Sequence, residues 1–188
     1  MLSDAKIMRR VAGYHDWRMD GITDLVIRGR EASVLDIGCN RGLVGFEMAN
    51  NGARLVHGLD IDEEVIKVAQ HLFADLRNCD SMFRVVDLSR GAGAMRPHFR
   101  DEYDIVLMLA TYHKLKRIMD AGKLSDLVRD IGKMTRKYFA WRGTSDKPNE
   151  NEEEARMLDR DLGNVGLRRI HTSYISESLG MAAIWRPR

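Results

Sequence analysis

Apolar and polar residues follow two alternating patterns along this chain, one typical of strands and one typical of helices. Five short apolar runs predict buried strands, at about 32–37, 54–59, 82–86, 103–109 and 137–141. Between them, apolar residues recur at helical spacing, at about 41–51, 62–76, 114–136 (broken near Gly122) and 151–162. Strands that alternate with helices predict a parallel sheet with helices on both faces.

Both ends of the chain add elements to this alternation. Apolar positions at helical spacing over residues 5–17, and again over 20–29, predict two N-terminal helices. Two closing strands, at about 167–174 and 181–185, are separated by a short turn that contains Gly180. Because this turn is too short for a helical crossover, one strand near the C-terminus must be antiparallel. The pattern therefore predicts an α/β fold with a seven-stranded, mostly parallel sheet.

Length and charge narrow the class of protein. The 188 residues suffice for one well-buried domain, expected over 1–188, and the formal net charge of +2 gives no global nucleic-acid-binding signature. No apolar run is long enough for a membrane span or a signal peptide, so we expect no membrane association. Cys39 and Cys79 match no metal or disulfide pattern, as expected of plain thiols in a reducing cytoplasm.

The most informative motif is an apolar run that ends in an acid and a glycine-bounded turn. It is the segment Val34–Gly42, VLDIGCNRG, and the next apolar run ends in another acid, Asp60. Acids at the ends of neighbouring parallel strands, beside a turn whose glycines admit a ligand to the backbone, are typical of adenosine-binding α/β proteins. Asp60 is placed to accept hydrogen bonds from ribose hydroxyls.

This motif differs from that of dinucleotide-binding proteins, which read G-x-G-x-x-G. VLDIGCNRG instead resembles motif I of class I S-adenosylmethionine-dependent methyltransferases, commonly written (V/L)LD(I/V)GCGxG, with Asn40 in place of the middle glycine. Asparagine tolerates a positive φ better than most residues, so the turn can persist. The resemblance covers about residues 31–186 and implies a Rossmann-like core, preceded by helices within 1–30.

The resemblance implies S-adenosylmethionine as cofactor, S-adenosylhomocysteine as product, and a residue for each part of the ligand. Asp36 would lie near the methionine part, Asp60 would hold the ribose, and Asp87 would accept from the adenine amino group. Further implied cofactor contacts are Gly38, Cys39, Asn40, Gly42, Ile61, Leu88 and Leu109. The alternative is that these acids only cap helices or turns, without any ligand.

Residues after the fourth predicted strand are expected to face the methyl donor. The segment Tyr112-His113-Lys114-Leu115 is similar to a histidine-containing segment of small-molecule and RNA-directed family members. His113 and Tyr112 are therefore the candidate catalytic residues, because a histidine with a pKa near ~6.5 can take a proton from a hydroxyl or carboxyl acceptor. Alternatively, His113 caps the following helix, and Tyr112 forms a wall beside the cofactor or substrate.

Candidate substrate-binding residues lie at the fifth strand and near the N-terminus. The fifth strand ends in Trp141-Arg142-Gly143 rather than in an acid, so we expect no metal. The Arg142 guanidinium could bind a carboxylate or phosphate of the acceptor, or it could pair with the acidic stretch 150–154. Tyr14 and Trp17 could fold over the cofactor as a lid.

The sequence favours a methyltransferase that acts on an oxygen of a small or carbohydrate-like metabolite. The (D/N)-P-P-(Y/F) motif of amino methylation is absent, as is the Pro-Cys pair of cytosine C5 methylation. A methyltransferase that acts on RNA (tRNA or a 5′-phosphate) is an alternative, although the near-neutral charge offers few clustered cations for phosphates. A further alternative is a methyltransferase-like binding module without catalysis, which works through a partner protein.

Overall fold

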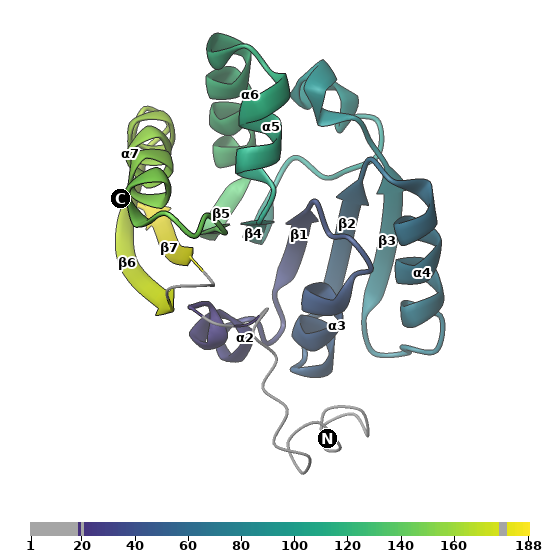
Figure 1. Cartoon of the computed structure of the whole chain (residues 1–188). Helices are drawn as coiled ribbons and strands as arrows, with labels where there is room; N and C mark the ends of the chain where they lie inside the picture. Colours follow the sequence, from purple (N-terminus) through teal and green to yellow (C-terminus); the bar gives the residue numbers. More distant parts are fainter. Residues whose placement is uncertain (1–18, 20, 177–179) are drawn as a thin grey trace.

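The computed structural model describes residues 19, 21–176 and 180–188. Seven strands form one sheet in the order β3-β2-β1-β4-β5-β7-β6 (Figure 1). The strands are β1 (Ser33–Ile37), β2 (Leu55–Asp60), β3 (Asp80–Val85), β4 (Tyr103–Leu109), β5 (Thr135–Gly143), β6 (Leu167–Ser176) and β7 (Gly180–Pro187). The α-helices are α2 (Thr23–Arg28), α3 (Leu43–Asn50), α4 (Glu63–Phe73), α5 (Tyr112–Ile118), α6 (Ala121–Lys133) and α7 (Pro148–Gly163). The 3₁₀ helices are η2 (Leu88–Arg90) and η3 (Ala92–Ala94).

Strand directions agree with the sequence-based expectation. The pairs β1–β2, β1–β4, β2–β3 and β4–β5 are parallel. β7 runs antiparallel to both of its neighbours, β5 and β6. The predicted α/β fold, with a mostly parallel sheet of seven strands and one antiparallel strand near the C-terminus, is therefore confirmed.

Alternate strand residues face two separate hydrophobic cores, because successive side chains of a strand point to opposite faces. Val34 and Ile105 belong to the core that also contains buried residues of α2, α3 and α4. Leu35 and Val106 belong to the core formed with α5, α6 and α7. Figure 1 shows these two groups of helices on opposite sides of the sheet. The prediction of helices on both faces is confirmed.

Several boundaries differ from those predicted, for reasons that lie in strand pairing and capping. β5 extends beyond 137–141 because Thr135 pairs with Tyr103 of β4 and Gly143 pairs with Met181 of β7. The helix predicted over 114–136 is two helices. The second begins after Asp120, whose side chain accepts hydrogen bonds from the first backbone N–H groups of α6.

At the N-terminus, the described helix α2 is shorter than the predicted 20–29. The helix predicted over residues 5–17 lies outside the described residues. Among the helices that the structure does describe, none combines the length and apolar character needed to span a membrane.

Candidate active site

A cavity of about 490 Å³ lies at the carboxyl ends of β1 to β5, where the sequence places its motifs. The cavity also receives residues from the starts of α3, α4 and α5. Nine of the residues implied for the cofactor line it: Asp36, Gly38, Cys39, Asn40, Asp60, Ile61, Asp87, Leu88 and Leu109. Acids from three adjacent strands therefore meet around one cavity.

The turn after β1 is tied to the end of β2 by backbone and side-chain hydrogen bonds. The N–H groups of Gly38 and Cys39 both donate to the Leu59 carbonyl, at 2.8 and 2.9 Å. The Asn40 N–H donates to Asp60 Oδ2 at 2.9 Å. Asn40 has a φ of 49°, so it adopts the left-handed conformation expected from the sequence. The turn and Asp60 thus form one connected unit.

Gly38 lies where the turn after β1 meets the end of β4. Its φ is 71°, and a Cβ at this position would overlap the Thr111 side chain. The Thr111 hydroxyl donates to the carbonyl oxygens of Ile37 and Leu109, which lie 3.1 and 3.2 Å from Thr111 Oγ1. These contacts fix the position of the Thr111 side chain. The absence of a side chain at Gly38 therefore allows Thr111 to enter the cavity wall.

The substitution Gly38→Ala is expected to lower the free energy of unfolding by about 1–2 kcal/mol, the cost of a left-handed L-residue. The overlap with Thr111 adds to this cost. Urea denaturation measures the change. Gly93→Ala is the matched control, because no heavy atom lies within 4 Å of a Cβ placed there. Equal losses in the two variants would contradict this account of the turn.

Asp36 is a buried acid on the cavity floor, with only 3% of its surface exposed. Burial, followed by the negative charge of Asp60, raises the pKa of the Asp36 carboxyl to about 7. A backbone hydrogen bond from Gly45 and the positive charge of Arg142 lower this pKa, but by less than burial and Asp60 raise it. Arg142 is itself buried and lines the cavity, as the sequence predicted. The floor of the cavity therefore favours a ligand that brings positive charge.

Asp87 has a capping role in addition to its place on the cavity wall. Its Oδ1 accepts hydrogen bonds from the Ser89 N–H at 2.9 Å and the Ser89 hydroxyl at 2.7 Å. These bonds lower the pKa of the Asp87 carboxyl. Asp87 therefore caps the turn that follows β3, which is the alternative role that the sequence allowed for it. This role leaves Oδ2 of an ionised carboxylate available to a ligand.

Apolar side chains form the rim and walls of the cavity. Ile61 is 63% exposed and Ile118 is 66% exposed, although both are large apolar residues. Leu88 and Leu109 line the interior. Exposed apolar residues beside a cavity with a few convergent polar groups are typical of a small-molecule site.

The two predicted catalytic residues are not brought to this cavity. Tyr112 is 1% exposed, and its hydroxyl lies 3.8 Å from Met157 Sδ of α7, within the core. Burial raises the pKa of the Tyr112 phenol, which keeps it neutral. The half-buried His113 is likewise not a lining residue. The helical rotation of α5 instead presents Lys114 and Ile118, one turn apart, to the cavity.

Two further predictions concern Gly42, as a cofactor contact, and Tyr14 and Trp17, as a lid over the cofactor. Gly42 does not line the cavity. It has a φ of 74°, and a Cβ there would lie 3.0 Å from the Ala69 Cβ, so its glycine serves the packing of α3 against α4. Tyr14 and Trp17 lie outside the described residues, and the lid stays a prediction.

The lining residues that were not predicted from the sequence include Thr111, Lys114 and Ile118. One signal could have found part of this set. Ile118 is an apolar residue one helical turn after Lys114, on the side of the helix away from the inward-facing Tyr112.

The chain matches one protein-family model and the curated methyltransferase/kinase WbdD. The methyltransferase domain family matches residues 34–135. The O-antigen chain terminator bifunctional methyltransferase/kinase WbdD of Escherichia coli is 24% identical over 158 residues. That alignment covers 76% of this chain and 22% of WbdD. The chain therefore spans about a fifth of the length of this curated relative.

Solved structures share the fold at low sequence identity. Magnesium protoporphyrin IX methyltransferase from Synechocystis PCC 6803, with bound SAH, has a TM-score of 0.65 and 18% identity. The match covers 98% of this chain and 86% of that one. Ribosomal protein L11 methylase from Lactobacillus delbrueckii subsp. bulgaricus has a TM-score of 0.60 and 13% identity, covering 88% of this chain and 76% of that one. The substrates that these names specify differ, so the shared fold leaves the acceptor open.

Proposed function

Because this chain belongs to the methyltransferase domain family, we propose that its cavity binds S-adenosylmethionine. We further propose that it transfers the methyl group to an oxygen of a small or carbohydrate-like metabolite. One observation carries the cofactor assignment: Asp36, Asp60 and Asp87 lie at or just beyond the carboxyl ends of three adjacent strands and line a single cavity with apolar walls. This arrangement suits a ligand that is cationic at one end and has ribose hydroxyls and a flat ring at the other.

Each part of the cavity has a task in this proposal. Asp60 accepts hydrogen bonds from the ribose hydroxyls, and Ile61 covers one face of the adenine. Asp87 Oδ2 accepts from the adenine amino group, while the Asp36 carboxylate stabilises the positive charge of the methionine part. The magnesium protoporphyrin IX methyltransferase that shares this fold was crystallised with SAH and with SAM, which supports the choice of cofactor.

The three acids and two of the cations that line the cavity lie at different strands of the sheet. Asp36 and Asp60 lie at the carboxyl ends of β1 and β2, and Asp87 follows β3. Lys114 and Arg142 line the cavity beside β4 and β5, while Arg41 lines it from the turn after β1. The acceptor would bind beside β4 and β5. A buried guanidinium there suits a carboxylate or another anionic oxygen of the acceptor. The name of WbdD, an O-antigen chain terminator, is compatible with a carbohydrate-like acceptor.

The chemistry requires little from the protein beyond orientation. Bound S-adenosylmethionine supplies an electrophilic methyl group on a sulfonium. The chain's own residues hold the acceptor oxygen in line with that methyl and exclude water, which is a large part of the rate enhancement in such displacements. Arg142, anchored at the end of β5 beside β4, can orient an anionic acceptor without moving.

Calorimetric titration with S-adenosylmethionine and S-adenosylhomocysteine tests the cofactor. We expect a dissociation constant near the micromolar range, about −8 kcal/mol. Absence of both heat and thermal stabilisation with either ligand would refute the cofactor assignment.

The acceptor class is tested with methyl-labelled S-adenosylmethionine and a cell extract, with and without nuclease treatment. Label in small molecules that persists after nuclease treatment is the expected result. Label that disappears with nuclease would support RNA as the acceptor and contradict the proposed metabolite.

A further inference from the structure

A second cavity, of about 430 Å³, lies on the sheet face that carries α2. It is bordered by Arg28 of α2, Tyr138 of β5, His171 of β6 and Arg186 of β7, and we call it the α2 groove. Among the described residues, it shares no lining residue with the cofactor cavity. Tyr138 precedes Arg142 of the cofactor cavity by four residues of β5, a separation of roughly 13 Å along the strand. The groove is therefore a separate site.

The groove exists because described helices cover the two faces of β6 and β7 unequally. On one face, Trp185 packs in the core with α7, a helix of 16 residues. On the other face, Ile184 packs in the core with α2, which has six residues. Helix α2 is therefore only about 9 Å long, whereas the ten residues of β6 span about 33 Å. Part of this face stays uncovered, and Ile170 of β6 is 46% exposed.

Two exposed arginines line the groove without an ion-pair partner among the described residues. They are Arg28, in the last turn of α2, and Arg186, near the end of β7. Arg168 of β6 lies directly opposite Arg186 in the strand register. Their side chains therefore share one face of the sheet, where like charges on opposite residues are destabilising. An anion bound at this place would remove that repulsion.

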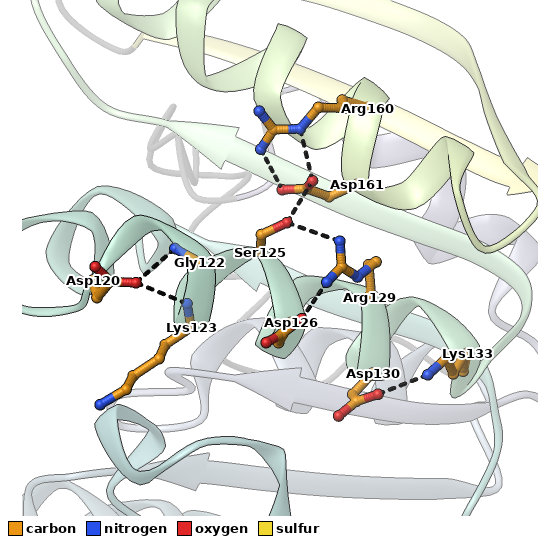
Figure 2. A network of polar contacts seen from close by, with 10 residues as sticks. All are labelled: Asp120, Gly122, Lys123, Ser125, Asp126, Arg129, Asp130, Lys133, Arg160 and Asp161. Carbon is orange, nitrogen blue, oxygen red and sulfur yellow. Dashed lines mark hydrogen bonds and ion pairs between the residues drawn. The ribbon is translucent and has the colours of Figure 1, made fainter.

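On the opposite face of these strands, where α7 lies, arginines are paired with acids. Arg169, the residue after Arg168 on β6, places its Nη2 atom 2.8 Å from Asp159 Oδ2 of α7. Figure 2 shows a second such pair on α7, in which Arg160 Nε lies 2.9 Å from Asp161 Oδ1. The two groove arginines lack such partners in the described structure. Their guanidinium groups are therefore available to an anion from outside the chain.

Two guanidinium groups on separate elements favour a phosphate over a carboxylate. A carboxylate has two oxygens and a single negative charge, which one guanidinium can satisfy with two parallel hydrogen bonds. A phosphate monoester has three terminal oxygens and a charge of about −1.5 to −2 at neutral pH. It can therefore accept hydrogen bonds from Arg28 and Arg186 at the same time.

The other polar groups of the groove are suited to hydroxyl groups of a ligand. Thr23, Tyr138 and Ser173 bring side-chain hydroxyls, which both donate and accept. The Ser173 hydroxyl lies 2.7 Å from His171 Nε2, so these two side chains are held together. Asp24 of α2 also lines the groove, and its carboxylate only accepts. A nucleic acid strand, with a charge on every phosphate, would be repelled by Asp24, whereas a hydroxyl group would bind to it.

We propose that the α2 groove binds a small sugar phosphate, as a ligand site separate from the cofactor cavity. Arg28 and Arg186 bind its phosphate group, and Asp24 accepts hydrogen bonds from its hydroxyl groups. The apolar face of the sugar ring packs on Tyr138 and Ile170. A cavity of about 430 Å³ is in the range of small-molecule sites. The inference does not depend on methyl transfer, because it uses none of the residues of the cofactor cavity.

Calorimetric titration of the full chain with glucose 6-phosphate and with ribose 5-phosphate tests the groove. We expect at least one of them to bind about tenfold tighter than glucose, which lacks the phosphate, and than inorganic phosphate, which lacks the hydroxyls. Arg28→Met and Arg186→Met should each weaken this binding about tenfold, as expected for a hydrogen bond to a charged group. Both arginines are exposed, so the variants should fold, and thermal unfolding verifies this.

Two control variants should bind the sugar phosphate as the wild type does. Arg77→Met removes an exposed arginine of the α4–β3 loop that lines neither cavity, and Lys114→Met removes a cation of the cofactor cavity. Failure of both sugar phosphates to bind, or equal losses in Arg28→Met and Arg77→Met, would overturn the site. A loss in Lys114→Met alone would place the phosphate in the cofactor cavity, which contradicts the proposal. Inorganic phosphate that binds as tightly as the sugar phosphates would show that the groove does not recognise a sugar.

Discussion

Replacing Asp60 with alanine is expected to weaken S-adenosylmethionine binding by about 1.5–3 kcal/mol, the range for hydrogen bonds to a charged group. In affinity this is a loss of roughly 10–150-fold, measured by calorimetric titration. The physical reason is twofold. The variant loses the acceptor for the ribose hydroxyls, and it also loses the bond that holds the Asn40 N–H at 2.9 Å and thereby the turn after β1.

Asp62→Ala is the matched control for this variant, because Asp62 is an acid of the same loop that does not line the cavity. Its Oδ1 accepts from the Glu64 N–H at 2.9 Å and caps α4. Loss of such a cap costs about 1 kcal/mol of stability, and the affinity should stay unchanged. If Asp60→Ala and the wild type bind S-adenosylmethionine with the same affinity, Asp60 does not bind the ribose.

The cofactor side of the site could be predicted from the sequence because its information is local. Asp36, Asp60 and Asp87 each end an apolar run, and parallel strands bring their carboxyl ends to one edge of the sheet. The positive φ of Asn40 also follows from local conformational preference. Position in the chain therefore determines the position of these residues in space.

The acceptor side could not be predicted in the same way, because it depends on the rotation of a helix about its axis. Tyr112 and His113 follow β4 as expected, but α5 begins at Tyr112, and this residue turns into the core beside Met157. Lys114 then faces the cavity instead.

The stability of the ligand-free protein should fall as pH rises from about 4 to about 7, because of Asp36. Its pKa is raised from 3.8 to about 7 in the folded state, so the neutral carboxyl is the form that folding favours. A group with a raised pKa contributes stability that is complete below its unfolded pKa and is lost as pH rises through the folded value. The total loss is about 4 kcal/mol, of which about 2–3 kcal/mol falls between about pH 5 and pH 8.

Asp36→Asn removes this titration, since the amide cannot ionise. Urea unfolding of both proteins across that pH range should show the variant gaining about 2–3 kcal/mol relative to the wild type, with every other titrating group cancelling in the difference. Asp87→Asn serves as control: hydrogen bonds from Ser89 lower the pKa of Asp87, so it is ionised in both states above about pH 5 and its difference should stay flat. A flat difference for Asp36→Asn as well would mean that Asp36 is already ionised in the folded protein. The charge of Arg142 would then outweigh burial and the repulsion from Asp60.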